Sequence, residues 1–300
     1  MFQKKDVICF LGDSITANGL CMAEVYQVLQ KKYGVKCYNC GVSGGSARNA
    51  TSYLHSNCLI YNPDYVVILF GINDIDCVHY GEKYNDMEGR EELLCKALEV
   101  YRESMEKLVV ECMDSGAKVI LCVPVPYDQI SDCEAENYMC QRGLDQCEDF
   151  IRILAEKYHC PIVDYKRTML PMLGVRGVIS PDRVHPTPEG YHVMAQTFLR
   201  DVGEIETSDF DTPFVMEGWN EARYTAERRL SFTNYVEFCA LIREGWEQNK
   251  TSEEKKQMAR KLLEDCEDKT SYQAQGYQSY IDTIDQRAQL LGEIVRLTIY

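Results

Sequence analysis

Residues 65–74 of the chain read YVVILFGIND, an apolar run that ends in glycine, isoleucine, asparagine and aspartate. A continuous run of this kind at residues 65–70 is typical of a parallel β-strand that is buried on both faces. Such a strand needs helices above and below its sheet. The stretch therefore predicts an α/β fold, with Asn73 and Asp74 at the carboxyl edge of the sheet.

The segments on either side of this stretch alternate between strand and helix patterns. We expect further strands at residues 7–11, 35–39, 118–123 and 161–164, and helices at residues 22–32, 47–59, 91–115, 134–158 and 187–199. Strands that alternate with helices of this length predict one parallel sheet of about five strands, covered on both faces. In such sheets ligands bind beyond the carboxyl ends of the strands.

After about residue 202 the pattern changes, and we divide the chain into domains 1–201 and 202–300. The second part shows helical patterns and no strand signal. The patterns are an apolar stripe from Tyr235 to Trp246, a helix opened by the capping box at 251–254, and a seam from Tyr277 to Val295. We expect an all-helical extension that packs on the first domain or on a second subunit, rather than an independent binding module.

Composition excludes several kinds of partner. The 300 residues include 32 basic and 47 acidic side chains, which gives a formal net charge of −15. A chain this acidic repels phosphate groups, so we expect neither nucleic-acid binding nor binding to an anionic membrane. The apolar run at residues 7–11 is too short for a signal-peptide core, and no run approaches the ~18 residues of a membrane helix. These features favour a cytoplasmic location.

The 15 cysteines point the same way, because several lie inside apolar runs. Cysteine used as a small buried hydrophobe fits a reducing cytosol better than a disulfide framework does. Cys37 and Cys40 form a C-x-x-C motif, but a strand would turn them to opposite faces, so we predict no metal site there. The seven-residue spacing of Cys133, Cys140 and Cys147 indicates one packed side of a helix.

Four polar blocks carry reactive groups. Ser14, Gly44 and Asn73 follow the first three predicted strands, while Asp182 and His185 precede the closing helix. Alone, each block also fits an ordinary turn, a helix cap or a solvated histidine. Together they supply a nucleophile, a base, a carboxylate three residues before that base, and hydrogen-bond donors for an oxyanion. The combination indicates acyl transfer to water.

The four blocks resemble those of the GDSL/SGNH hydrolases, a family of serine esterases and lipases. The matching segments stand in the family's order: FLGDSIT at 10–16, NCGVSGG at 39–45, FGIND at 70–74 and DRVHPTPEGY at 182–191. The resemblance covers about residues 5–200. It implies a flavodoxin-like three-layer α/β/α fold, with a serine that does not lie on a G-x-S-x-G elbow.

The resemblance also implies a role for each matching residue. Ser14 would be the nucleophile, His185 the general base and then the general acid, and Asp182 the group that orients His185. The oxyanion hole would consist of the backbone N–H groups of Ser14 and Gly44 and the side-chain amide of Asn73.

Four more residues are candidates for substrate binding. Asp13 and Asp74 are expected mainly to shape their loops by local hydrogen bonds. His79 and Tyr80 lie in a polar insertion at residues 76–89, and a loop at this rim can form a wall of the substrate pocket. No cofactor is implied, and no metal either, because no two histidines stand at a ligand spacing with a carboxylate.

The expected function is hydrolysis of a small or medium carboxylic ester through an acyl-enzyme. The family's many carbohydrate deacetylases favour an O-acetyl group on a carbohydrate as the substrate. The alternatives are an acyl hydrolase of the thioesterase or lysophospholipase type, or a scaffold protein that works through its helical extension. The expected partner is a small-molecule ester, and the C-terminal helices are a candidate surface for homo-oligomers.

Overall fold

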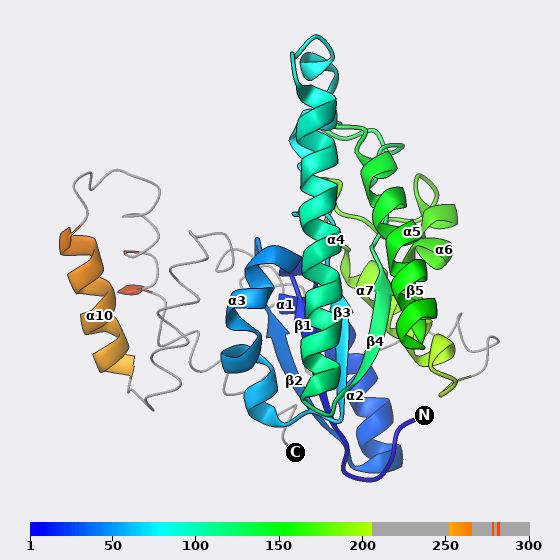
Figure 1. The fold of residues 1–300 in the computed structure, drawn as a ribbon, viewed down its shortest axis with the longest axis vertical. Helices are drawn as coiled ribbons and strands as arrows, with labels where there is room; N and C mark the ends of the chain where they lie inside the picture. The colour runs from blue at the N-terminus through cyan, green and yellow to red at the C-terminus, as the bar shows by residue number, and fades with distance from the viewer. Residues whose placement is uncertain (206–251, 266–277, 279–280, 283–300) are drawn as a thin grey trace. The chain divides into compact units, whose positions relative to one another are not determined.

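The computed structural model describes residues 1–205, 252–265, 278 and 281–282 (Figure 1). Contacts divide the chain into two units, Met1–Gly41 with Gly45–Phe214 and Val42–Gly44 with Val215–Tyr300. The first unit holds every described strand and, apart from Gly44, every residue that the sequence predicts at the active site.

Helix α10, Ser252–Asp265, belongs to the second unit. It matches the helix expected after the capping box at residues 251–254. The stripe from Tyr235 to Trp246 and most of the seam from Tyr277 to Val295 lie outside the described residues. The other two helices of the extension therefore stay predictions.

Five parallel strands form the sheet of the first unit, as predicted. They are β1 (Val7–Gly12), β2 (Lys36–Gly41), β3 (Tyr65–Leu69), β4 (Lys118–Val123) and β5 (Ile162–Asp164). Their order is β2-β1-β3-β4-β5, which is the flavodoxin-like order. In this order the chain reverses its winding between β1 and β3, and the loops that leave these two strands diverge. Ligands bind at such a switch point.

Helices cover both faces of this sheet. They are α1 (Ser14–Ala17), α2 (Leu20–Tyr33), α3 (Ala47–Asn57), α4 (Arg90–Asp114), α5 (Gln141–Tyr158), α6 (Tyr165–Met169) and α7 (Pro188–Asp201). Helix α2 packs against α7, while α3 packs against α4 and α4 against α5 on the opposite face (Figure 1). Short 3₁₀ turns lie at Leu59–Tyr61, Cys77–Tyr80, Glu82–Tyr84 and Leu170–Met172. None of the described helices is long and apolar enough to cross a membrane.

One predicted helix is wrong in its first seven residues. The pattern predicts a helix over 134–158, but α5 begins at Gln141. Residues 134–140 form a loop instead, because the carbonyl of Ala135 accepts a hydrogen bond from Arg183 and Met139 has a left-handed φ of +53°. The seven-residue spacing of Cys133, Cys140 and Cys147 therefore does not mark one helix face.

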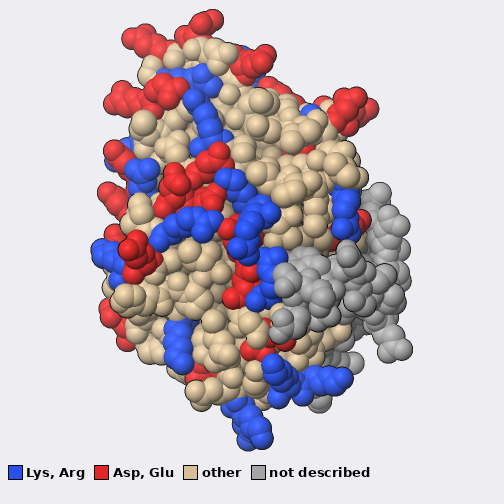
Figure 2. All heavy atoms as spheres, turned by 90° about the vertical axis from the view of Figure 1, so that its right-hand side faces the viewer, with Lys and Arg blue, Asp and Glu red and all other residues tan. Residues whose placement is uncertain are grey.

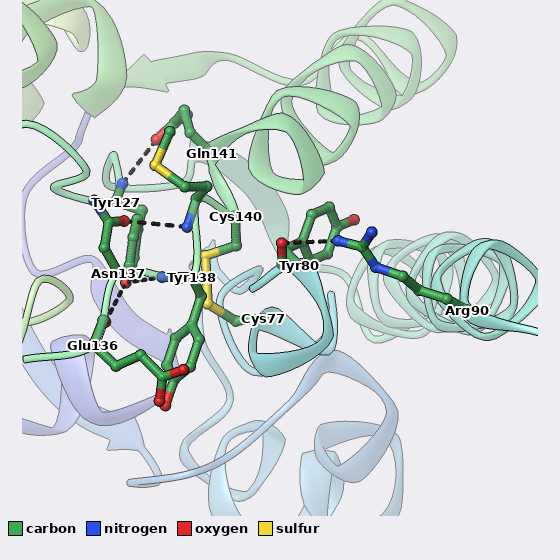
Figure 3. Close-up of a disulfide and its surroundings, with 10 residues drawn as sticks. Cys77, Tyr80, Arg90, Tyr127, Glu136, Asn137, Tyr138, Cys140 and Gln141 are labelled. Carbon is green, nitrogen blue, oxygen red and sulfur yellow. Dashed lines mark hydrogen bonds between the residues drawn. A yellow bond between two sulfur atoms is a disulfide. The ribbon is translucent and has the colours of Figure 1, made fainter. Parts of the chain in front are cut away.

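Cys140 forms a disulfide with Cys77, which corrects the prediction that the cysteines stay reduced (Figure 3). The bond joins the start of α5 to the loop that follows β3. Eleven other cysteines of the described residues are free, and most of them are buried, as expected of small apolar side chains.

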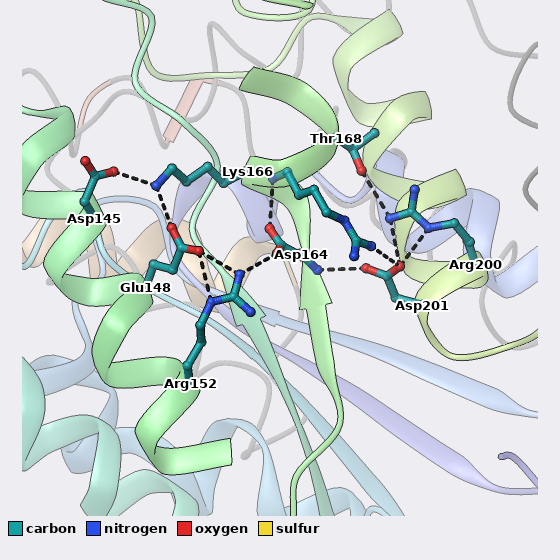
Figure 4. A network of polar contacts seen from close by, with 9 residues as sticks. Asp145, Glu148, Arg152, Asp164, Lys166, Thr168, Arg200 and Asp201 are labelled. Atoms are coloured by element: carbon teal, nitrogen blue, oxygen red, sulfur yellow. Dashed lines mark hydrogen bonds and ion pairs between the residues drawn. The ribbon is translucent and has the colours of Figure 1, made fainter. Parts of the chain in front are cut away.

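A network of charged side chains lies beside β5, an edge strand of the sheet. Arg152 of α5 contacts the carboxylates of Glu148 and Asp164 at 2.7 and 2.6 Å, and Asp201 accepts a hydrogen bond from the backbone N–H of Asp164 (Figure 4). Acidic and basic side chains are intermingled on this side of the molecule (Figure 2). Charges of this kind protect an edge strand from pairing with another chain.

Candidate active site

Ser14 lies directly beyond the carboxyl end of β1, as its first block predicts. It is the first residue of α1, and the carboxylate of Asp13 caps this helix by accepting a hydrogen bond from the N–H of Ile15 at 2.9 Å. The turn is tight, since a Cβ on Gly12 would lie 2.7 Å from the carbonyl oxygen of Leu69. Glycine at residue 12 therefore lets β1 run beside β3 and end in the serine.

His185 reaches Ser14 from a loop 171 residues further along the chain. Its Nε2 lies 2.8 Å from the Oγ of Ser14, and its Nδ1 lies 3.0 Å from Oδ2 of Asp182. With Nδ1–H donated to the carboxylate, Nε2 is left to accept the proton of the serine hydroxyl. Helix α7 begins just after this loop, where the Oγ1 of Thr187 accepts a hydrogen bond from the N–H of Gly190 at 3.1 Å.

Asp182 is held as a carboxylate by several donors. Its Oδ1 accepts hydrogen bonds from the Oγ of Ser180 and from the N–H groups of Val184 and His185, at 2.7 to 3.0 Å. Burial alone would raise the pKa of Asp182, but the hydrogen bonds and the positive charge of His185 hold it well below its usual value. A permanently charged partner of this kind fixes the tautomer of the imidazole and stabilises its protonated form.

Hydrogen bonds join the loop after β2 to the loop after β3. The exposed side chain of Asn73 donates one amide hydrogen to the carbonyl of Gly45 at 2.9 Å, and Oδ1 of Asp74 accepts from the N–H of Ala47 at 2.8 Å. The second amide hydrogen of Asn73 is left for another acceptor. Gly44 has a φ of +69°, a conformation that favours glycine, and its role as an oxyanion donor stays a prediction.

Asp13 and Asp74 shape these loops from the inside. Asp13 is 2% exposed, and its place among the candidate substrate contacts stays a prediction. Burial raises the pKa of Asp13 to about 6, and burial with the nearby charge of Asp13 raises the pKa of Asp74 to about 8. Oδ2 of Asp74 is buried with no hydrogen-bond partner among the described residues, which also favours a neutral, protonated carboxyl.

His79 and Tyr80 have different surroundings in the insertion after Asn73. The half-buried ring of His79 contacts Asp76 through Nδ1 at 2.9 Å, so it stays a candidate for substrate binding. Tyr80 is 5% exposed, and its ring lies 5.0 Å from the guanidinium carbon of Arg142. The ring of Tyr80 is therefore packed inside the protein (Figure 3), and its contact with substrate stays a prediction.

Three buried cysteines are the one group in the described part of the chain whose side chains could share a metal ion. The sulfurs of Cys9, Cys40 and Cys58 lie within 4.8 Å of one another. Cys37 is not in this group, as expected for a C-x-x-C motif whose members alternate across a strand. All three are buried: Cys9 lies in β1, Cys40 lies in β2, and Cys58 directly follows α3.

Sequence reasoning misses two features beside the site. One is the disulfide between Cys77 and Cys140, and the other is the buried side chain of Arg183, which contacts residues 128–135. Arg183 lies inside the matched block DRVH, which is the signal that could have singled it out. Its partners are about 50 residues away, and no pattern in the sequence identifies them.

The comparison with known proteins agrees with this geometry. The model of the GDSL-like lipase/acylhydrolase family matches residues 8–198. A curated acetylxylan esterase of Geobacillus stearothermophilus is 26% identical over 220 residues, which cover 65% of this chain and 93% of that protein.

Solved structures show the same fold. The acetylxylan esterase Axe2 of Geobacillus stearothermophilus has a TM-score of 0.54 and 24% identity, and the match covers 68% of this chain and 98% of that one. LAE5, an α/β hydrolase from the metagenome of Lake Arreo in Spain, has a TM-score of 0.56 and 23% identity, with coverage of 69% and 99%. Catalytic mutants of Axe2 with a serine, an aspartate or a histidine replaced by alanine have also been solved.

Proposed function

The chain belongs to the GDSL-like lipase/acylhydrolase family, and within this family we propose an esterase that removes O-acetyl groups from carbohydrates. As a family member it is a carboxylic ester hydrolase. The observation that carries the proposal is the series of contacts from Ser14 through His185 to Asp182, at 2.8 and 3.0 Å. The acetylated carbohydrate is proposed because a relative of similar fold is an acetylxylan esterase.

The geometry fits a two-step mechanism. The Oγ of Ser14 attacks the ester carbonyl while Nε2 of His185 takes its proton, and the same nitrogen then gives that proton to the leaving alcohol. A water molecule, deprotonated by His185, then attacks the acyl-serine, and His185 returns that proton to the Oγ of Ser14 as the carboxylic acid leaves. Asp182 stays ionised throughout and stabilises the imidazolium, which fits the lowered pKa of its carboxyl group.

The negative charge that develops on the carbonyl oxygen needs fixed donors. We assign this role to the N–H groups of Ser14 and Gly44 and to the amide of Asn73. The hydrogen bond from Asn73 to Gly45 supports the assignment, because it holds the amide while leaving one hydrogen for the oxyanion.

Hydrolysis of p-nitrophenyl acetate by the wild type and by Ser14→Ala tests the reaction. We expect release of p-nitrophenol that disappears in Ser14→Ala and persists in Ser52→Ala, which changes an exposed serine of α3. Release of acetate from acetylated xylo-oligosaccharides, compared with p-nitrophenyl esters of longer acids, tests the substrate class. A preference for long acyl chains would replace the acetylesterase by an acyl hydrolase of the thioesterase or lysophospholipase type.

We also propose a cytoplasmic location and homo-oligomers formed through the C-terminal helices. Acidic composition and mostly free, buried cysteines support the first proposal. The disulfide between Cys77 and Cys140 opposes it, because reducing compartments keep thiols free. Cell fractionation, combined with thiol labelling of the isolated protein, tests whether the protein is cytoplasmic with free thiols or lies in an oxidising compartment with the disulfide formed.

A further inference from the structure

Arg183 is a buried residue that lies between Asp182 and His185 in the sequence. It lies one residue after Asp182 and two before His185, is 6% exposed, and has a left-handed φ of +70°. This backbone conformation is uncommon for a residue with a side chain and persists only where the surroundings hold it. The contacts of the side chain show what holds it.

The guanidinium of Arg183 donates four hydrogen bonds to backbone carbonyls of the loop between β4 and α5. The acceptors are Ala135 for Nε at 2.9 Å, Asp128 and Ser131 for Nη1 at 3.0 and 2.9 Å, and Cys133 for Nη2 at 3.3 Å. Carbonyls of residues 128–135 thus surround the planar group. A buried cation needs this number of acceptors, since desolvation would otherwise be costly.

The backbone adds a fifth bond between the same two segments. The N–H of Asp128 donates to the carbonyl of Arg183 at 2.9 Å. The carboxylate of Asp128 accepts from the N–H groups of Ile130 and Ser131 at 3.1 and 2.9 Å, and this turn presents the carbonyls to the guanidinium. Residues 128–135 therefore form a loop whose backbone carbonyls bind the side chain of Arg183.

The residues on either side of this loop, Tyr127 and Tyr138, are also held in place by hydrogen bonds (Figure 3). The N–H of Tyr127 donates to the side chain of Gln141 at 2.8 Å, and the hydroxyl of Tyr127 accepts from the N–H of Tyr138 at 3.1 Å. Cys140, the residue before Gln141, carries the disulfide to Cys77. The loop that surrounds Arg183 is thus attached to α5 and to the loop after β3.

We propose that Arg183 is a positioning residue, which holds Asp182 and His185 in register with Ser14 by binding the carbonyls of residues 128–135. The inference rests on the proposed function of that site. Without the guanidinium, the left-handed turn at residue 183 loses its support, and His185 moves relative to Ser14. A misplacement of about 1 Å can cost about 10²-fold in rate. Lysine cannot substitute, because its ammonium is not a planar fork and reaches fewer of the four carbonyls.

The first test compares the kinetics of Arg183→Lys with those of the wild type on p-nitrophenyl acetate. We expect kcat to fall by about 10- to 100-fold and KM to change less than about threefold, because Arg183 acts through His185 and not on the substrate. Arg152→Lys is the matched control, since Arg152 binds carboxylates beside β5 and does not touch either loop. Equal kcat for Arg183→Lys and the control overturns the proposal.

A spectroscopic readout separates positioning from general loss of structure. The proton shared by Nδ1 of His185 and Asp182 should give a low-field ¹H NMR signal in the wild type, assigned by its loss in His185→Gln. We expect this signal to weaken or vanish in Arg183→Lys while the circular dichroism spectrum is retained. A signal that persists unchanged in a folded Arg183→Lys overturns the proposal.

A second pair of variants approaches the same contact from the other loop, in case Arg183→Lys does not fold. Asp128→Ala removes the turn that presents the carbonyls, whereas Asp128→Asn keeps an acceptor for the same N–H groups. We expect a lower kcat for Asp128→Ala and near wild-type kcat for Asp128→Asn. Where both single variants fold, coupled effects in the double variant support the proposal, and purely additive effects contradict it. Failure of the proposed function itself is distinct, since Ser14→Ala would then match the wild type.

Discussion

Asn73 supplies the side-chain donor on which the oxyanion assignment depends. Asn73 lies in the loop that follows β3, and its amide donates a hydrogen bond to the carbonyl of Gly45. Loss of one oxyanion donor typically costs about 10² to 10³ in kcat, because the charge appears only in the transition state. We therefore expect Asn73→Ala to lower kcat on p-nitrophenyl acetate by that factor, with a small change in KM.

Asn49→Ala is a suitable control for this prediction. Asn49 is exposed on α3, and its backbone N–H, not its side chain, takes part in the helix cap at Ser46. Activity of Asn73→Ala within about tenfold of the control would contradict the oxyanion role.

Asp74 should make the stability of the protein depend on pH. The pKa of its carboxyl rises from 3.8 to about 8 on folding, chiefly through burial. The folded chain therefore binds a proton that the unfolded chain releases, and stability falls as pH rises from about 4 to about 8. Asp74→Asn has no such proton and avoids this loss. The melting temperature of the variant minus that of the wild type should therefore increase as pH rises over this range.

The measurement is a series of thermal melts between pH 5 and pH 9. The difference in melting temperature between Asp74→Asn and the wild type should grow up to about pH 8 and then level off. A part of the difference in melting temperature that is the same at every pH would reflect how the new amide packs, and not the titration of Asp74. A difference that does not change with pH would mean that Asp74 is ionised in the folded protein at neutral pH.

At the scale of the elements, a disulfide joins the loop after β3 to the start of α5. We expect its reduction to lower the stability of the folded protein. Cys77 and Cys140 are 63 residues apart in the sequence. A cross-link over a loop of this length stabilises by up to about 4 kcal/mol in the chain-entropy description. We expect a dithiol reductant, or Cys77→Ser with Cys140→Ser, to lower the melting temperature.

Cys95→Ser provides the control for the disulfide, because Cys95 is a free, exposed cysteine of α4. It should melt like the wild type with or without reductant. If the reductant leaves the wild-type melting temperature unchanged, the two loops are held by their packing and the disulfide adds nothing measurable.

At this scale the sequence predicts what is encoded locally. All five strands lie within two residues of their predicted ends, because apolar runs and the turn residues after them are short-range signals. Thr187 caps α7 as its sequence position indicates. The helix expected from residue 134 is the exception. Arg183 hydrogen-bonds to this segment and Cys77 forms a disulfide with it, and both residues are distant in the sequence.

The candidate site follows the same division. Ser14, Asp182 and His185 are predicted by the motifs that contain them, and the fold brings their side chains into hydrogen-bond contact. The burial of Asp13 and Tyr80 could not be predicted, because it depends on how separate loops pack over each other. Long-range contacts of that kind leave no periodic trace in the sequence.

For the whole molecule, the open question is how much of the chain the reaction needs. The first unit ends at Phe214 and holds the sheet, Ser14 and His185, whereas the second unit includes Val42–Gly44. That short segment starts at the end of β2 and leads into Gly45, whose carbonyl is bonded to Asn73. Because both of its ends are fixed within the first unit, we expect residues 42–44 to form their turn without the C-terminal residues.

A chain cut after residue 214 should therefore fold and hydrolyse p-nitrophenyl acetate with kcat within about tenfold of the full chain. Circular dichroism and kinetics test this, and light scattering compares the oligomeric state of the two chains. A full-length dimer with an active, monomeric 1–214 chain would assign the C-terminal helices to association. An unfolded 1–214 chain would mean that the helical extension completes the core, and a folded but inactive one that it completes the active site.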